Sequence, residues 1–307
     1  MHDCSMIEVT PCVDPLDELT SLGIYNSAWP YDTVTIDAVH AFRDSAQHYV
    51  DYLVRDDSVA VGSGVGAIFG YRTNRVVSLI TVLAAHRRQG VGSKLYGALS
   101  VWASERGALE MESPVAEDDV ESLSFAQRRG FVEERREVRL VLRLADVSPL
   151  PVTLPDGIEI VTWAQRPELA RGIYAVEIEA RPDIPGFGDV APEPFEEWMA
   201  HFMRRPTDSP HATFIALANE EVVGYAKLSL TAPTAAGNSM TAVKRAWRGR
   251  GVARALKATE INWALANGYG ELHTSNEERN EPVNRLNARL GYRPGVATIY
   301  LVGPLGP

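Results

Sequence analysis

The chain contains only two cysteines, Cys4 and Cys12, among 307 residues. A disulfide framework needs more cysteines, spread along a short chain. No pair of histidines at metal-ligand spacing accompanies the two cysteines, so we expect no metal site. The scarcity of cysteine argues against a disulfide-rich scaffold and against a zinc module.

Long apolar runs are also missing from the sequence. No stretch of 18 consecutive apolar residues occurs, and the first residues lack the basic and apolar regions of a secretory signal. We therefore expect a cytoplasmic protein with no membrane partner.

Positive charge is scarce. The chain has 30 Lys and Arg against 40 Asp and Glu, a formal net charge of −10. Because non-specific nucleic-acid binding depends on clustered Lys and Arg, we expect no nucleic-acid partner. An acidic chain of this kind needs a local basic site to hold an anion.

What is present is an ordinary globular composition, with 45% hydrophobic and 23% charged residues. Such a composition argues against disorder and collagen-like repeats. A length of 307 residues favours two domains, because single hydrophobic cores stop growing below that size.

An internal repeat supports two domains. When the chain is shifted by 161 positions, residues 87–131 align with residues 248–292 without a gap and share 11 identities in 45 positions. Ordinary composition would give about 3 by chance. The period is too long for a solenoid, so we interpret the repeat as a duplicated domain.

The boundary is expected in the Pro-rich segment between the repeats. Residues 146–157 read DVSPLPVTLPDG, and prolines there prevent a continuous helix or a central strand. We predict an N-terminal domain over 1–147, a linker over 148–157 and a C-terminal domain over 158–307.

Both halves show the same order of elements. In the second half, strands 211–218 and 222–230 should form a hairpin around Asn219-Glu220, followed by a helix over 251–267 that ends at Gly268. Helix 90–106 and strands 59–69 and 76–82 are their counterparts in the first half. Strands in hairpins followed by strands alternating with helices predict an α/β (α+β) fold with a mixed sheet flanked by helices.

The repeated block starts with Arg-x-x-Gly-x-Gly/Ala, where a strand gives way to a helix. Glycines leave the first N–H groups of the helix accessible, and the helix dipole with nearby arginines favours an anion. This turn predicts a diphosphate site, although a plain strand-to-helix turn is the alternative. Neither copy has the Gly-Lys-Ser/Thr of a Walker A loop, and the position after several strands disfavours a dinucleotide fingerprint.

The order strand, Arg-x-x-Gly-x-Gly/Ala, helix, strand, helix and Gly-Phe/Tyr, present twice, resembles the GNAT superfamily of acyl-CoA-dependent N-acetyltransferases. The second half is the closer match. The resemblance implies two tandem GNAT-like domains, each with a mostly antiparallel central sheet flanked by helices, and acetyl-CoA as the cofactor.

The resemblance also implies the residues that bind acetyl-CoA. Those expected at the diphosphate are Arg87, Arg88, Gln89, Gly90, Val91 and Gly92 in the first half, and Arg248, Gly249, Arg250, Gly251, Val252 and Ala253 in the second. Those expected along the pantetheine arm are Thr81 and Val82, then Thr241, Ala242, Val243, Asn276 and Asn280. Asp119 aligns with Asn280, where an acid fits an anionic cofactor poorly; a plain N-cap is the alternative for Asp119.

Catalytic groups are harder to predict. Many GNAT enzymes place a Tyr four residues before the glycine of Gly-Phe/Tyr to protonate the thiolate, and this chain has Ala126 and Asn287 there. Asn287 can still hydrogen-bond the sulfur. A base for the amine must come from elsewhere, and the candidates are Glu177, Glu179, Asp183, Glu197 and His273.

We therefore expect an N-acetyltransferase that moves the acetyl group of acetyl-CoA to a primary amine of a small molecule or peptide by direct attack in a ternary complex. The second half is the expected catalytic module, in a monomer or homodimer. A non-catalytic CoA-binding sensor and an acetyltransferase resembling mycothiol synthase stay open as alternatives.

Overall fold

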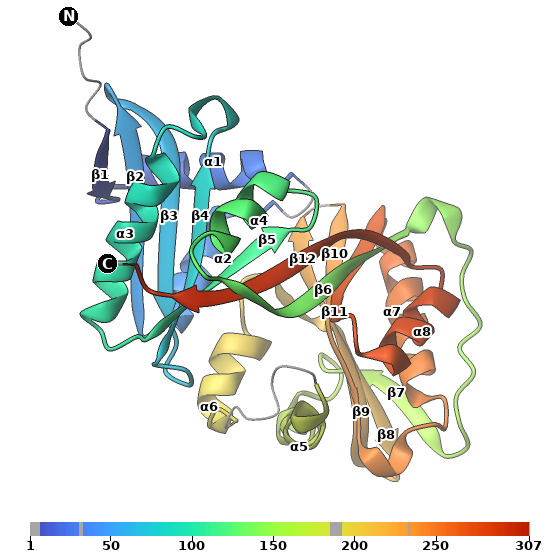
Figure 1. Ribbon diagram of the computed structural model, residues 1–307. Coiled ribbons are helices and arrows are strands. Elements are labelled where there is room, and N and C mark those ends of the chain that lie inside the picture. The colour runs from blue at the N-terminus through green and yellow to red at the C-terminus, as the bar shows by residue number, and fades with distance from the viewer. Residues whose placement is uncertain (1–6, 31–32, 185–191, 233, 307) are drawn as a thin grey trace, which may run out of the picture. The chain divides into compact units, whose positions relative to one another are not determined.

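The computed structural model describes residues 7–30, 33–184, 192–232 and 234–306. The chain divides into two compact units, residues 1–135 with 298–307 and residues 136–297. Each unit is a mixed sheet with helices on both faces, which confirms the predicted fold class (Figure 1). Cys4 lies outside the described residues, and Cys12 is a free thiol.

The first unit has the strand order β1-β2-β3-β4-β5-β12. Its strands are β1 (Glu8–Pro11), β2 (His48–Asp56), β3 (Val59–Ile68), β4 (Arg75–Val82), β5 (Glu110–Ala116) and β12 (Arg293–Pro304). Its helices are α1 (Pro15–Ala28), α2 (Ile36–Ser45), α3 (Val91–Ser104) and α4 (Val120–Gln127). The pair β4–β5 is parallel and the other neighbours are antiparallel. Asp51 of β2 bonds Ser21 of α1 while Tyr52 packs against the core beneath α3, so these helices cover opposite faces.

The second unit repeats this arrangement with the order β6-β11-β10-β9-β8-β7. Its strands are β6 (Val132–Arg143), β7 (Ile158–Thr162), β8 (Asp208–Ala218), β9 (Glu221–Ala232), β10 (Ala235–Val243) and β11 (Glu271–Glu277). Its helices are α5 (Ala170–Ala180), α6 (Phe195–Trp198) with a π-helical turn over Met199–Met203, α7 (Val252–Ala266) and α8 (Glu281–Arg289). Again one pair, β10–β11, is parallel. A Cβ on Gly224 would touch Leu256 of α7, whereas Tyr225 bonds Glu177 of α5, so α5 and α7 lie on opposite faces.

The last strand of each sequence half completes the sheet of the other unit. Strand β12 pairs with β5 in the first unit, and β6 pairs with β11 in the second. The compact units therefore differ from the predicted domains 1–147 and 158–307, and the predicted linker 148–157 lies inside the second unit. The physical reason is that the sequence pattern locates these strands but does not specify their partners.

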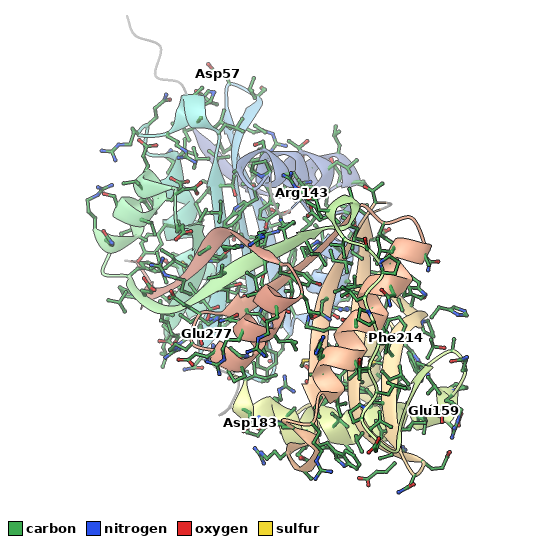
Figure 2. The ribbon with its side chains drawn as sticks, turned by 90° about the vertical axis from the view of Figure 1, so that its right-hand side faces the viewer. Asp57, Arg143, Glu159, Asp183, Phe214 and Glu277 are labelled. Atoms are coloured by element: carbon green, nitrogen blue, oxygen red, sulfur yellow. The ribbon has the colours of Figure 1, made fainter. Side chains whose placement is uncertain are left out.

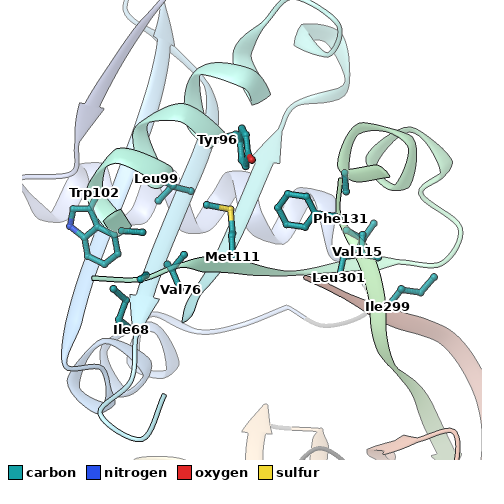
Figure 3. Close-up of a cluster of buried hydrophobic side chains, with 13 residues drawn as sticks. Ile68, Val76, Tyr96, Leu99, Trp102, Met111, Val115, Phe131, Ile299 and Leu301 are labelled. Carbon is teal, nitrogen blue, oxygen red and sulfur yellow. The ribbon is translucent and has the colours of Figure 1, made fainter. Parts of the chain in front are cut away.

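The core of the first unit lies between the sheet and helices α3 and α4 (Figure 3). Trp102 of α3 is buried there. Strand β12 contributes Ile299 and Leu301, which are 5% and 3% exposed. Two residues from the far end of the chain thus help to close this core.

Both units have the same tight hairpin, which joins β2 to β3 in the first unit and β8 to β9 in the second. Asp57 and Ser58 in one, and Asn219 and Glu220 in the other, have φ between 47° and 74°. Two successive left-handed residues form the turn that suits the twist of paired strands. The predicted hairpin at Asn219-Glu220 is confirmed. No helix in the described ranges is long and apolar enough to span a bilayer.

Candidate functional site

The parallel strands of each unit part after a short pairing. Among the described residues, only Arg75–Val77 of β4 pair with β5, where their partners are Glu110–Glu112. The two strands nevertheless continue to Val82 and Ala116. In the second unit the pairing runs from Ala235 to Gly237 on β10. We call the point where each pair separates the vertex. Beyond each vertex, the two strands show no further pairing with each other among the described residues.

A helix begins beside each opening with a glycine as its N-cap. Gly90 precedes α3 with φ 87°, and Gly251 precedes α7 with φ 92°. Within the described part of the chain, no side chain hydrogen-bonds the start of either helix. Helix α1, in contrast, has its first N–H groups bonded to Asp14. The starts of α3 and α7 therefore keep free N–H groups and the positive end of the helix dipole for an anion.

The first unit has a cavity of about 620 Å³ at this opening. Its walls are the parted ends of β4 and β5, the first turns of α3, and α4. The predicted cofactor residues among them are Thr81, Val82, Arg87, Arg88, Gly90 and Gly92. Val91 instead belongs to the buried core, and the Gln89 side chain donates to the Ala85 carbonyl. Ala28 and Trp29, at the end of α1, line the same cavity.

The walls of this cavity combine an apolar floor with a charged rim. Tyr96, Met111 and Phe131 are buried wall residues. The rim carries Arg128 and Arg129. Such a lining suits a ligand with an apolar arm and an anionic end.

The first arginine of each turn makes the same backbone contact. Arg87 Nε donates to the Val82 carbonyl at 3.4 Å, and Arg248 Nε donates to the Val243 carbonyl at 2.9 Å. The other guanidinium nitrogens pair with acids, Asp119 in the first unit and Asp183 in the second. A bound diphosphate would compete with these carboxylates for the same donors.

Asp119 has two roles that the sequence left as alternatives. Its side chain accepts from the Ser122 N–H at 3.0 Å and so caps α4. It also lies 3.1 Å from Arg87 and lines the cavity. The aligned Asn280 precedes α8 without a side-chain cap bond among the described residues.

The predicted bases Asp183 and Glu179 both contact the segment Arg245–Arg248 that leads into α7. Asp183, labelled in Figure 2, bonds Arg245 at 2.8 Å and Arg248 at 2.7 Å. These arginines lower the pKa of Asp183 to about 2. The Glu179 carboxylate accepts from the Arg245 N–H at 2.6 Å. A carboxylate held by two arginines accepts a proton poorly at neutral pH, which disfavours Asp183 as a base.

Glu177 lies in a different environment. It is 5% exposed and accepts a hydrogen bond from the Tyr225 hydroxyl at 2.6 Å. Burial raises its pKa above the ordinary value. A buried carboxyl with a raised pKa is a better proton acceptor at neutral pH than a surface carboxylate.

A buried lysine near Glu177 was not predicted. Lys227 is fully buried, and its Nζ lies 2.9 Å from Asp208 and bonds the Phe202 carbonyl. Burial lowers its pKa to about 8. The signal in the sequence was a charged residue within a largely apolar strand.

The remaining predicted residues lie at or beyond the vertex of the second unit. Asn287 is fully buried on α8, and neither of its amide atoms has a hydrogen-bond partner among the described residues. Asn276 has a similarly unpartnered Nδ2. Thr241 bonds Asn238, and the ring of His273 lies against Gly237, where an added Cβ would be 2.9 Å from Nε2. No hydrogen bond within the described ranges links Asn287 to Glu177, so the predicted catalytic residues form no single cluster.

A buried polar cluster at the same vertex was also missed. Asn238, Lys257 and Glu260 are 9%, 1% and 1% exposed. Lys257 Nζ donates to Asn238 Oδ1 at 2.9 Å, and Asn238 Nδ2 lies 2.8 Å and 2.9 Å from the two Glu260 oxygens. The signal was present in the repeat, where the positions of Lys257 and Glu260 match Tyr96 and Leu99 of the first half. Within the described residues, no group of three or more His, Cys, Asp or Glu side chains is placed to hold a metal ion.

Comparison with known proteins gives two family matches. The model of the acetyltransferase (GNAT) family matches residues 17–131 and 174–292. The stretch between the matches contains the predicted linker. The aminoglycoside N(6')-acetyltransferase type 1 of Salmonella typhimurium is 30% identical over 100 residues, which are 30% of this chain and 69% of that enzyme.

Solved structures share the whole fold. A tandem GNAT protein from the clavulanic acid biosynthesis pathway superposes with a TM-score of 0.78 at 21% identity, over 98% of this chain and 99% of that one. A GCN5-related N-acetyltransferase from Sphaerobacter thermophilus gives 0.77 at 21% identity, over 98% and 96%. These similarities establish the tandem architecture.

Proposed function

Because the chain belongs to the acetyltransferase (GNAT) family, we propose that it moves the acetyl group of acetyl-CoA to a primary amine by direct attack in a ternary complex. The observation that carries this proposal is the uncapped helix start beside each strand opening. Free N–H groups at Val91 and Val252 suit a diphosphate, and the parted strands leave room for the arm attached to it.

Acetyl-CoA would supply the activated acetyl thioester. Arg87 and Arg248 would move from their acidic partners to the diphosphate while keeping their Nε bonds to the strand ends. The cavity of the first unit, with its apolar floor and charged rim, fits the pantetheine arm and the anionic end of this molecule.

The chemical step needs a neutral amine. A free amine of pKa about 10.4 is neutral in about one molecule in 2,500 at pH 7, a cost of about 4.6 kcal/mol. We propose Glu177, on α5, as the group that takes the proton, because its burial raises the pKa of its carboxyl.

We propose the second unit as the catalytic module and the first as a cofactor-holding copy. The second unit supplies polar groups at its vertex, Asn238, Lys257 and Asn287, whereas the first has Val77, Tyr96 and Ala126 at the matching positions. Positioning the amine and the thioester together accounts for about 7–11 kcal/mol of barrier reduction in well-oriented systems.

The acceptor that we propose is a cationic amine. The net charge of −10 favours cations at the surface, and the Salmonella relative is by its name an aminoglycoside acetyltransferase. An aminoglycoside, a polyamine and a peptide N-terminus present the required primary amine.

The test measures CoA release with each of these amines, together with calorimetric titration of acetyl-CoA. We expect turnover with at least one cationic amine. The variants Arg88→Glu and Arg250→Glu, one in each turn, should each remove binding at one site, and only Arg250→Glu should abolish turnover. Tight binding of acetyl-CoA without turnover over the whole panel would favour the non-catalytic sensor instead.

A further inference from the structure

The two units differ where their strands part. The 161-residue shift pairs Val77 with Asn238, Tyr96 with Lys257, and Leu99 with Glu260. All six side chains except Val77 are less than a tenth exposed. The duplication has therefore kept a neutral set in the first unit and a buried charged set in the second, and each unit serves as a control for the other.

The charged set sits directly at the vertex of the second unit. Asn238 follows Gly237, the last residue of β10 that pairs with β11. Its carbonyl accepts from the Thr274 hydroxyl at 3.1 Å, across the opening on β11. Lys257 reaches this point from α7 and bonds Asn238 Oδ1 at 2.9 Å. The ammonium of Lys257 is thus held at the inner end of the opening.

The first unit indicates which space Lys257 faces. Tyr96, its counterpart, lines the cavity of about 620 Å³, together with Ala126 and Phe131. The counterparts of these two are Asn287 and Tyr292. Lys257 Nζ lies 5.4 Å from the centre of the Tyr292 ring. The matching pair in the first unit is also in contact, because the ring centres of Tyr96 and Phe131 are 6.0 Å apart. By this repeat, we expect Lys257 and Asn287, whose amide has no hydrogen-bond partner among the described residues, to border the corresponding space of the second unit.

We propose that Lys257 is the catalytic acid of the second unit and donates a proton to the sulfur of the departing CoA. This inference rests on the proposed function. As the amine nitrogen bonds to the acetyl carbon, the C–S bond breaks and its electron pair stays on sulfur. The sulfur takes a proton from the Lys257 ammonium, and the amine gives its surplus proton to the base on the acceptor side. Water re-protonates Lys257 when CoA leaves.

Lys257 would thereby protonate the thiolate, which is the role of the tyrosine that both halves lack. Asn287, in the position of that tyrosine, has no proton to give but can orient the sulfur with its free amide. Asn238 fixes the direction of Nζ, and Glu260 compensates the charge.

The electrostatics of the cluster suit this role. Glu260 and Tyr292 are the titratable groups that the described contacts place around Lys257. Burial lowers the pKa of Lys257, and the Glu260 charge opposes that shift. Burial raises the pKa of Glu260 to about 7. A lysine with a lowered pKa is a stronger proton donor to a departing thiolate than a surface lysine, whose pKa is about 10.4.

The test follows the thiol of bound CoA rather than turnover. Thiolate absorbance in the ultraviolet is titrated between pH 6 and 10 with CoA bound to the full chain, and turnover is measured in parallel. An ammonium beside the sulfur should lower the thiol pKa by about 1 unit or more relative to free CoA. Lys257→Met should abolish this shift while CoA still binds, and kcat should fall at least tenfold with KM for the amine little changed.

Two further variants keep the test decisive. Lys94→Met makes the same change at an exposed lysine of α3 and should leave the shift intact. If Lys257→Met does not fold, Lys257→Tyr with Glu260→Leu copies the pair found in the first unit and should also lose the shift. An unshifted thiol in the unaltered chain, or a shift that survives these variants, would overturn the role of Lys257. A chain that binds no CoA at all would overturn the proposed function itself.

Discussion

Two residues of the first unit, Asp51 and Cys12, have raised pKa values although they lie outside the cavity. Asp51 of β2 faces α1, where its carboxylate accepts a hydrogen bond from Ser21 at 2.8 Å. Burial raises the pKa of Asp51 to about 6. Burial raises the pKa of the Cys12 thiol most, and the negative charge of Asp51 raises it further. The site therefore disfavours negative charge, and ionising Asp51 costs folding free energy.

The sign of this effect gives a pH prediction. Because the pKa of Asp51 is higher in the folded chain than its ordinary value of 3.8, its stabilising contribution is complete below pH 4 and is lost as pH rises through 6. Asp51→Asn should raise the free energy of unfolding at pH 7.5 by up to about 2–3 kcal/mol, and the gain should vanish near pH 4. Thermal unfolding at both pH values measures this. The exposed Asp44→Asn is the control, and an equal gain at pH 4 would contradict the assignment.

The sequence predicted the positions of the two glycine turns, but it did not predict which charged residues are buried. Arg87 and Arg248 could be found because glycines follow at fixed spacing. Lys257 and Glu260 were missed as buried residues because Lys and Glu on a helix are usually solvated, although the repeat aligns them with Tyr96 and Leu99. The decisive information, that their neighbours Asn238 and Tyr292 come from other elements, is tertiary. The same holds for Asp183, whose arginine partners are more than 60 residues away.

At the scale of elements, α3 and α7 depend on a left-handed residue at their start. Gly251 has φ 92°, and an added Cβ would meet no atom within 4 Å. The cost of a side chain there is therefore a backbone cost, which is about 1–2 kcal/mol for an L-residue. The glycine also keeps the helix start open to an anion.

Matched glycine substitutions test this requirement. Gly251→Ala should destabilise the chain by about 1–2 kcal/mol and weaken acetyl-CoA binding in the second unit. Gly97 lies inside α3, also with no atom within 4 Å of an added Cβ, so Gly97→Ala should stabilise by about 0.5–1 kcal/mol. Urea midpoints and acetyl-CoA titration distinguish the two. Equal effects of the two substitutions would show that the start of α7 needs no left-handed residue.

The sequence predicted the bounds of a helix or strand where residues at its ends mark them clearly. The predicted helix 90–106 is α3, Val91–Ser104, because glycines mark both ends. The short α6 continues instead as a π-helical turn, where Trp198 and Met203 pack into the core of the second unit. Strand β1 was missed, because its four residues have no apolar run of their own and gain their structure from pairing with β2.

The whole molecule is built by exchange of the last strands. Strands β6 and β12 both follow the Gly-Phe/Tyr of their half, so the sequence around them is alike and cannot specify a partner. Their partners are set by long-range packing. In the first unit, Ile299 and Leu301 enter the core, and the Pro304 carbonyl accepts the Tyr96 hydroxyl at 2.9 Å. Each compact unit therefore needs residues from both halves of the chain.

Cutting the chain within 148–157 tests this exchange. The fragment 1–152 lacks β12, and the fragment 153–307 lacks β6. Loss of Ile299 and Leu301 alone removes two buried side chains worth about 2–5 kcal/mol each, so we expect neither fragment to unfold cooperatively by itself. Co-expression should restore a complex with the cooperative unfolding of the intact chain. Ending the chain after Ala297 is the matched control, because it removes a strand from the first unit only and should leave residues 136–297 resistant to proteolysis. Two separate fragments that each unfold cooperatively at the midpoint of the intact chain would mean that each half completes its own sheet.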